Sequence, residues 1–501
     1  MTADTKREVE RKYEATPDSR LPDLTRVRGV SAVHDRGVAD LDAVYYDTAD
    51  LRLAAAGVTL RRRTGGADAG WHLKLPVAPG TRDEIHAPLS DDVPAGLAAL
   101  VRARTRGAEL LPLVRLRSSR DVRHLVDARG TLLAEVSTDT VHAERLTEGG
   151  RAAAWTEVEA ELADDGDPAF LDAVGKRLRK AGLRPSRTPS KLARALAETG
   201  TAPPPRPEAD RTAGGHLLRY LREQADQLLE QDAAVRRDLP DSVHRMRVAT
   251  RRMRSAFRTY RKVLDRSATA PVAEELKWLA AELGTARDQE VLAARLRARV
   301  DDLPDTLLLG PVSARLVAWS AAGRAGARER TLAVLDSDRY LALLDALDAL
   351  LADPPLRPAA ADAPGDVLPR AILKDYDRLA TRVDRALALP AGHDRDLALH
   401  AARKAAKRVR YAAEAARPAL GKPAKRFGKR VKAVQQLLGD HQDSVVARDV
   451  LRKLAIQAHA SGETAFTWGL LHGQERAEAA QLERELPGIW AKVSGGKGGR
   501  L

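Results

Sequence analysis

Glu8, Glu10 and Lys12 stand two residues apart near the start of the chain, in the segment Glu8-Val9-Glu10-Arg11-Lys12. In an extended strand alternate side chains share a face, so two carboxylates and an ammonium would lie on one side within about 14 Å. Carboxylate oxygens suit Mg²⁺ or Mn²⁺, and an ammonium suits a phosphate. The segment therefore indicates half of a metal–polyphosphate site. The alternative is an exposed strand whose charges simply face solvent.

Further charged sets recur at the same two-residue spacing along residues 1–200. Inward charges in a sheet or barrel are costly unless they are paired or bind a ligand, so the repetition favours a barrel with a cation-lined interior. Lys74 lies between two leucines and is predicted to be an inward cation, and Glu135 and Asp139 are weaker metal candidates. The other sets are Arg61 and Arg63, Arg115 and Arg117, and Glu157, Glu159 and Glu161.

Short alternating segments separated by Gly, Asp and Pro are predicted to position these side chains. This pattern is typical of an antiparallel sheet or barrel, and helical periodicity over 95–106, 167–181 and 189–198 adds flanking helices. The fold class expected for this part is α+β. The predicted strands cover residues 43–47, 58–63, 71–75, 114–117, 131–137 and 154–161.

A Pro-rich stretch at 198–211 predicts a linker between two domains, one spanning 5–197 and one spanning 212–490. The second domain is rich in Ala, Leu, Arg and Glu and is predicted to be all helical. A Pro/Ala-rich segment divides it into repeats at about 212–351 and 367–490. Residues 491–501 are expected to be a disordered tail.

The two helical halves repeat one another. The segment from Val243 to Arg254 aligns without gaps to the segment from Leu399 to Arg410, and Leu283–Asp288 aligns to Leu438–Asp443. Two segments in one register indicate a duplication, so we expect two helical bundles related by a pseudo-two-fold. The matched residues are His244 with His400, Arg247 with Arg403, Arg251 with Lys407, and Arg254 with Arg410.

On a helical wheel these residues, together with Arg258, form a narrow cationic stripe opposite an apolar face. No acidic residue is interleaved on either helix to relieve the repulsion, so the stripe suggests a bound anion rather than a merely solvated face. With only 4% aromatic residues the chain lacks stacking platforms, which favours inorganic polyphosphate over single-stranded nucleic acid. Duplex DNA held by its backbone stays open.

Charge and composition agree with this division. Residues 1–200 hold 32 basic and 31 acidic residues, whereas residues 201–501 hold 52 and 39, so the anionic partner is expected in the second domain. The chain has no Cys, which excludes disulfides and thiolate chemistry. Neither a long apolar run nor an export signal is visible, so we expect a cytoplasmic protein with no membrane contact, which could associate with polyphosphate granules.

The chain resembles a known pair of domains. Glu8-x-Glu10-x-Lys12, Tyr45-Tyr-Asp-Thr48, Leu60-Arg-x-Arg63, Trp71-His-Leu-Lys74, Arg82-x-Glu84, Arg115-x-Arg117, Glu157-x-Glu159 and Ser190-Lys191 resemble, in order, a CYTH domain of the triphosphate tunnel metalloenzymes. The duplicated helical part resembles a CHAD domain.

The resemblance implies an eight-stranded antiparallel tunnel that hydrolyses inorganic triphosphate or short polyphosphate with Mg²⁺ or Mn²⁺. It implies a metal-binding role for Glu8, Glu10, Glu157 and Glu159, and catalytic roles for Glu8, Glu10 and Lys12. Phosphate would be held by Lys12, Arg61, Arg63, Lys74, Arg115, Arg117 and Lys191. It also implies polyphosphate binding by the helical domain. The alternatives are a non-catalytic polyphosphate-binding protein and a tunnel acting as a nucleotide cyclase or thiamine triphosphatase.

Overall fold

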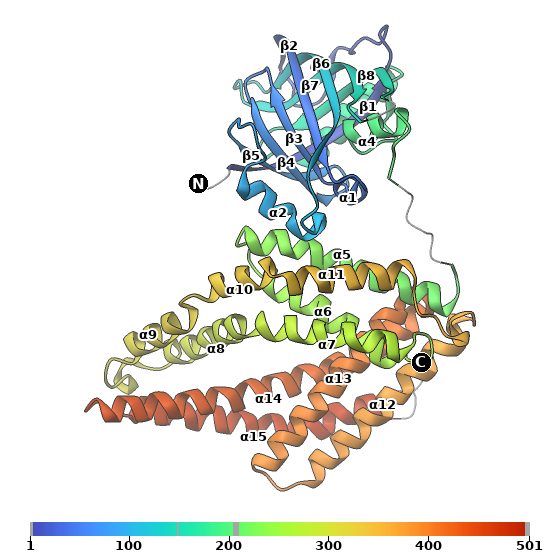
Figure 1. The fold of residues 1–501 in the computed structure, drawn as a ribbon. Coiled ribbons are helices and arrows are strands. Elements are labelled where there is room, and N and C mark those ends of the chain that lie inside the picture. Colours follow the sequence, from blue (N-terminus) through green and yellow to red (C-terminus); the bar gives the residue numbers. More distant parts are fainter. Residues whose placement is uncertain (1–3, 148–149, 204–209, 496–501) are drawn as a thin grey trace. The chain divides into compact units, whose positions relative to one another are not determined.

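The computed structural model describes residues 4–147, 150–203 and 210–495 and divides into two compact units, Met1–Arg206 and Pro207–Leu501 (Figure 1). The first unit is built around strands and the second is helical, as predicted. Within the described ranges no helix is both long and apolar enough to cross a bilayer.

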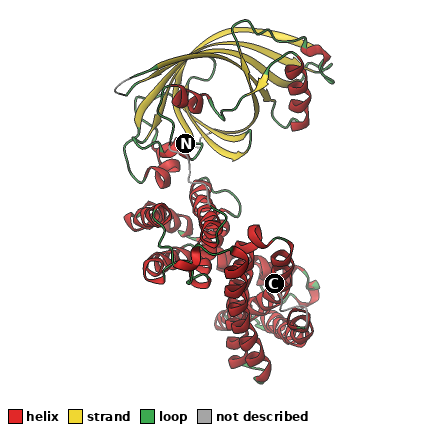
Figure 2. Cartoon of the chain, turned by 90° about the vertical axis from the view of Figure 1, so that its right-hand side faces the viewer, coloured by secondary structure: helices red, strands yellow, loops and turns green. Residues whose placement is uncertain are grey.

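Eight antiparallel strands of the first unit close into a barrel, which confirms the expected fold class. The sheet order is β5-β4-β3-β2-β6-β7-β8-β1-β9, and β5 also pairs with β1 to complete the ring, drawn in yellow in Figure 2. The strands are β1 (Asp4–Ala15), β2 (Ala32–Asp47), β3 (Thr59–Thr64), β4 (Gly70–Ala78), β5 (Thr81–Ala87), β6 (Leu111–Val126), β7 (Leu132–Arg145), β8 (Ala152–Leu162) and the two-residue β9 (Arg184–Pro185).

Strand β1 closes the barrel because its two halves pair with different partners. Its first half pairs with β5, where Glu8 lies opposite Arg82. Its second half pairs with β8, where Glu10 lies opposite Glu161. The opening segment of the chain therefore lies at the seam between the first and the last strands of the ring.

Helix α4 packs against the end of the barrel that is filled by apolar side chains. Leu192 and Leu196 of this helix belong to a buried cluster with Leu116 of β6 and Trp155 of β8. Since Leu116 and Arg120 are an even number of residues apart on β6, the two share a face of that strand. The helices of this unit are α1 (Arg52–Ala55), α2 (Ala95–Thr105), α3 (Pro168–Lys180) and α4 (Lys191–Glu198), with a 3₁₀ turn at Leu24–Arg26.

The second unit consists of helices, and α6 buries the apolar face that its helical wheel predicts. Helix α6 buries Met246, Ala249, Met253 and Phe257 on one side. The described helices are α5 (Ala213–Arg236), α6 (Ser242–Thr259), α7 (Arg266–Glu282), α8 (Gly284–Asp301), α9 (Val312–Arg324), α10 (Ala327–Asp336), α11 (Asp338–Ala352), α12 (Pro364–Ala388), α13 (His393–Leu420), α14 (Lys422–Ala460) and α15 (Phe466–Ser494), with 3₁₀ turns at Asp305–Leu307 and Pro358–Ala360.

The duplication seen in the sequence is also present in the contacts. A Cβ placed on Gly284 would lie 3.1 Å from the guanidinium of Arg247, and one placed on Gly439 would lie 3.5 Å from that of Arg403. These two glycines are equivalent in the repeat, and so are the two arginines. In each repeat, therefore, the arginine of the first matched segment contacts the glycine of the second matched segment.

Two expected boundaries differ from the structure. Residues 491–494, predicted to belong to a disordered tail, are helical, because α15 runs to Ser494 with Trp490 and Val493 buried and Trp490 stacked on Tyr376. Helix α12 begins at Pro364, a little before the expected start of the second repeat at about 367. Part of the predicted linker, 204–209, and the final residues 496–501 lie outside the described residues.

Candidate functional site

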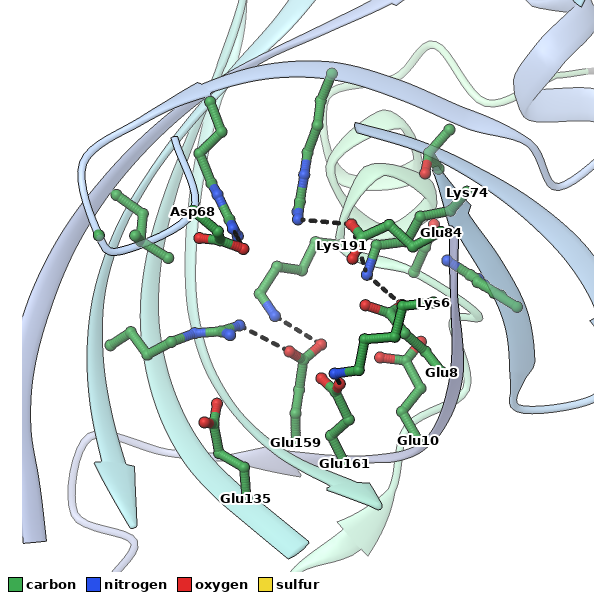
Figure 3. A pocket seen from close by; sticks show the side chains of 18 of the residues that line it. Lys6, Glu8, Glu10, Asp68, Lys74, Glu84, Glu135, Glu159, Glu161 and Lys191 are labelled. Atoms are coloured by element: carbon green, nitrogen blue, oxygen red, sulfur yellow. Dashed lines mark hydrogen bonds and ion pairs between the residues drawn. The ribbon is translucent and has the colours of Figure 1, made fainter. Parts of the chain in front are cut away.

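The barrel contains a cavity of about 400 Å³ whose lining carries both signs of charge (Figure 3). Most of its carboxylates come from the adjacent strands β7, β8 and β1 and lie side by side in Figure 3, whereas most of its lysines and arginines come from other elements, so an acidic wall faces a largely cationic one. The charged lining residues are Lys6, Glu8, Glu10, Lys12, Arg61, Arg63, Asp68, Lys74, Arg82, Glu84, Arg120, Glu135, Glu159, Glu161 and Lys191.

Alternate residues of β1 face this cavity, as the spacing of the opening segment predicts. Lys74 on β4 donates to the Glu8 carboxylate at 2.5 Å. Lys12 donates to Glu10 at 3.0 Å and also to Glu159 on β8. The ammonium groups thus bridge carboxylates on different strands.

Lys191, the first residue of α4, lies among three carboxylates. Its Nζ is 2.6 Å from Glu159, 2.8 Å from Glu157 and 3.0 Å from Asp139. Oxygens of these three acids lie within 4.8 Å of one another, a separation that a single cation could span. Arg120 of β6 also pairs with Glu159 at 2.9 Å and with Asp139 at 2.8 Å.

Two arginines of β3 project into the other side of the cavity. The Arg61 guanidinium donates to the Tyr45 hydroxyl at 3.2 Å and lies 3.6 Å from Glu84. Arg63 pairs with Asp68. Burial and the charges of Arg61 and Arg120 lower the pKa of Arg63 to about 9, so an added anion would relieve repulsion there.

The carboxylates of the cavity differ in their protonation equilibria. Burial raises the pKa of Glu8 to about 7, with Lys74 opposing the rise and Glu84 adding to it. Burial acts in the same direction on Glu10, but the charges of Lys12, Lys74 and Arg82 together lower the pKa of Glu10. Burial likewise opposes ionisation of Glu159, yet Lys12 and Lys191 hold its pKa well below the usual range. Glu8 is therefore the carboxyl whose charge responds to pH near neutrality.

Arg115 and Arg117 do not line the cavity, contrary to the role that the resemblance implied. Their side chains, 39% and 59% exposed, pair with Asp42 and Glu144. The two arginines share a face of β6, as predicted. Arg120 lines the cavity, and it lies an odd number of residues from both arginines, so Arg115 and Arg117 are on the outer face of the strand.

Sequence reasoning left three lining cations without a proposed role: Lys6, Arg82 and Arg120. Lys6 precedes Glu8 by two residues and pairs with Glu161 at 2.6 Å, so the alternation of β1 itself would have found it. Arg120 carries no comparable local signal. Its inward direction becomes evident only from its bonds to Asp139 and Glu159, which come from the next two strands.

The donor set fits a hard divalent cation. Glu8, Glu10, Glu157 and Glu159 offer carboxylate oxygens, the ligands that Mg²⁺ and Mn²⁺ prefer. Glu157 and Glu159 belong with Asp139 to the group whose oxygens could share one ion, whereas Glu8 and Glu10 line the cavity outside that group. Their present partners include the ammonium groups of Lys12, Lys74 and Lys191, so these lysine side chains would move from carboxylate to phosphate when metal and substrate bind together.

The cationic stripe of the helical unit is partly compensated by neighbouring helices. Arg247 forms a bidentate ion pair with Asp288 of α8 at 2.9 and 3.1 Å, and Arg403 lies 3.8 Å from Asp443 of α14. The sequence showed that no acid is interleaved on the same helix, but it did not show these acids on others. Burial and Arg403 nevertheless lower the pKa of Lys407 to about 7, which marks a surplus of positive charge.

The remaining stripe residues surround this centre. Arg251 lies close enough to Lys407 to contribute to that lowered pKa. His400 is half-buried, and burial together with Lys404 lowers its pKa, whereas His244 is exposed. Arg410 donates to Gln435 at 2.5 Å. Arg254 and Arg258 continue the stripe toward the end of α6.

Comparisons with known proteins match both units. The CYTH domain family matches residues 6–195 and the CHAD domain family matches residues 219–452. Two uncharacterized proteins of Mycobacterium tuberculosis, Rv2226 and MT2285, are each 40% identical to this chain over 97% of its length and 96% of theirs.

Two solved structures are similar to parts of the chain. PptA from Streptomyces chartreusis is 25% identical with a TM-score of 0.47, covering 56% of this chain and 99% of that protein. The CHAD domain from the plant Ricinus communis is 27% identical with a TM-score of 0.45, covering 57% and 94%.

Proposed function

This chain belongs to the CYTH–CHAD proteins, and on that premise we propose that its barrel hydrolyses inorganic triphosphate with Mg²⁺ or Mn²⁺ while its helical unit binds inorganic polyphosphate. The observation that carries the proposal is the mixed lining of the barrel cavity. Lysines and arginines from several strands and from α4 surround carboxylates that suit a divalent cation.

The cations of the lining would hold the three phosphates in an extended row. Arg61 and Arg63 present planar donors that match phosphate oxygens in pairs, and Lys12 and Lys74 add point charges. A divalent ion held by Glu8, Glu10, Glu157 and Glu159 would neutralise phosphate oxygens and lower the pKa of a bound water. The protein groups supply position and charge, which dominate phosphoryl transfer.

A nucleotide substrate is less favoured by the lining. Among the described residues that line the cavity, Tyr45 provides the aromatic ring, and its hydroxyl is already bonded to Arg61. A base would therefore find little surface on which to stack. Cyclase and thiamine triphosphatase activities rank below triphosphate hydrolysis for this reason.

Phosphate release from triphosphate tests the proposal. The wild type should release phosphate with Mn²⁺ or Mg²⁺ and not with EDTA, and the double variant Glu8→Gln/Glu10→Gln should lose at least 100-fold in kcat/KM, about 2.7 kcal/mol of transition-state stabilisation. ATP assayed in parallel measures preference between substrates. A wild-type rate equal to background would leave the non-catalytic alternative, and unchanged turnover in the double variant would exclude these ligands.

A further inference from the structure

A cationic pocket lies in the helical unit and shares Arg254 and Arg258 with the stripe, whereas its other arginines were not part of the sequence prediction. It has a volume of about 490 Å³, within the range of ligand sites, and lies among α6, α7, α12 and α13. Its arginines come from these four helices and from the turn that follows α6, and they outnumber the acids beside them. They are Arg254, Arg258, Arg261, Arg266, Arg378, Arg382 and Arg408.

Two carboxylates accompany the seven arginines and neutralise them only in part. Asp375 is buried beneath the pocket, where it accepts from Thr259 and Arg378 at 2.6 Å each and lies 3.7 Å from Arg408. Glu274 pairs with Lys277 at 2.7 Å. Across the described residues, no carboxylate lies within ion-pair distance of Arg258 or Arg382.

Comparison of the two repeats shows that the surplus of arginines over carboxylates occurs on one side of the bundle. In the alignment that pairs His244 with His400, Arg252 is equivalent to Arg408 and Arg258 to Glu414. Arg252 forms an ion pair with Glu414 at 2.5 Å, so the crossing of α6 and α13 is neutral on that side. On the other side the equivalent pair is Arg408 with Arg258, two like charges.

The effect of the like charges is visible in the protonation equilibrium of Arg408. Burial and the charge of Arg258 lower the pKa of Arg408, whose side chain is 15% exposed. Arg382 and Arg378 lower it further, against the opposing effect of Asp375. Burial and Arg258 act in the same way on the pKa of Arg254. A half-buried cluster of this kind is destabilising unless an anion shares it.

We propose that Arg258, Arg382 and Arg408 form a phosphate-binding pocket on one side of the duplicated bundle. It rests on the proposed function in one respect: we infer that the pocket receives the end of a polyphosphate chain held along the stripe, since Arg254 and Arg258 belong to both. Because the pocket occurs on one side of the bundle, the end of the polyphosphate chain would bind on that side, although the chain itself is symmetric and the two repeats are similar.

The substitution Arg258→Glu tests the pocket because it copies the residue of the other repeat. The introduced carboxylate would face Arg408 as Glu414 faces Arg252, so the fold should be retained and the pocket neutralised. Calorimetric titration of the full-length protein with inorganic pyrophosphate, at low salt without divalent metal, should show one binding site fewer than in the wild type. Arg452→Glu on the exposed face of α14 makes the same charge change elsewhere and should leave the number of sites unchanged.

A second variant guards against loss of fold. Arg382→Gln removes one cation without adding an acid, and it should weaken pyrophosphate binding at this site by about tenfold while circular dichroism stays unchanged. An unaltered number of sites in Arg258→Glu together with unaltered affinity in Arg382→Gln would overturn the pocket.

Long-chain polyphosphate distinguishes this proposal from the proposed function. Arg258→Glu changes the charge of the pocket by two, so the variant neutralises about two phosphates fewer. At about 0.7 for each phosphate, the slope of log affinity against log salt concentration should become less steep by roughly 1.4. If polyphosphate binds and the slope is unchanged, the chain does not enter the pocket. If the wild type binds pyrophosphate here but no polyphosphate, the pocket stands and the proposed role of the helical unit fails.

Discussion

At the scale of single residues, the barrel interior is held together by ion pairs that substrate binding would exchange. Lys74 contacts Glu8, and Lys12 contacts both Glu10 and Glu159. Buried charges are tolerated only when paired, so these contacts keep the cavity stable without ligands. Phosphate would replace the carboxylates as partner of the lysines, and metal would replace the lysines as partner of the carboxylates. Phosphate and metal should therefore bind together more tightly than either does alone.

The inward direction of Arg120 and the outward direction of Arg115 and Arg117 lead to a matched comparison. Arg120→Gln should lower kcat/KM for triphosphate by 10- to 100-fold, about 1.4–2.7 kcal/mol, because a cation at the cavity wall is lost. Arg115→Gln/Arg117→Gln, which removes two exposed charges, should leave it within twofold. Steady-state phosphate release measures both, and the reverse ranking would contradict the placement of β6.

The raised pKa of Glu8 predicts how stability depends on pH. Because the folded-state pKa of about 7 exceeds the unfolded value near 4.5, the folded state holds the extra proton between these values. The contribution of Glu8 to the free energy of unfolding is therefore present below pH 4.5 and is lost as pH rises through 7, by about 2–3 kcal/mol.

Denaturant unfolding in EDTA at pH 5 and pH 8 would measure this loss. In Glu8→Gln the difference between the two pH values should shrink by that amount, since glutamine does not titrate. An identical difference in wild type and variant would show that another group carries the pH dependence.

At the scale of elements, α4 links the barrel's core to its chemistry. Its cap is Ser190, whose hydroxyl accepts from the Ala193 backbone at 3.0 Å, and its next residue is Lys191. Its buried face contributes Leu192 and Leu196 to the cluster with Trp155. One short helix thus both fills the end of the barrel and places an ammonium among Asp139, Glu157 and Glu159.

Leu196→Ala tests this coupling. Leu196 is 1% exposed, so its truncation should lower the free energy of unfolding by about 2–5 kcal/mol. If the packing of α4 also positions Lys191, the KM for triphosphate should rise in the folded variant. Thermal unfolding and kinetics below the transition measure the two effects, and Glu198→Ala at the exposed end of α4 provides a comparison.

The sequence predicted elements better than it predicted orientations. The alternation around Glu8, Arg61, Lys74 and Glu159 correctly identified strands and shared faces. Which face of β6 points inward depends on its pairing with β2 and β7, and no local pattern contains that information. The acids opposite the helical stripe, Asp288 and Asp443, were likewise beyond the reach of a single-helix wheel, because they come from separate helices.

At the scale of the whole molecule, the two proposed activities are assigned to separate compact units and should be separable by substitution. Arg247→Ala/Arg403→Ala should lose polyphosphate binding, by at least tenfold at physiological salt, since it removes two equivalent cations. The same variant should hydrolyse triphosphate at the wild-type rate, and Glu8→Gln/Glu10→Gln should bind polyphosphate normally. Titration with polyphosphate, with duplex DNA of equal charge as competitor, measures binding. Full affinity in the double arginine variant would refute the stripe.

The seam at β1 has a consequence for how the protein is made. Glu10 at the start of the chain pairs with Glu161, so the ring cannot close until β8 has been synthesised and has left the ribosome. Until then β1 is an unpaired edge on its β8 side, and contacts so distant in sequence form slowly. A nascent chain that ends before β8 would therefore not hold Glu8 and Glu10 beside Glu159. The candidate site would form only once β8, and then α4 with Lys191, have joined the barrel.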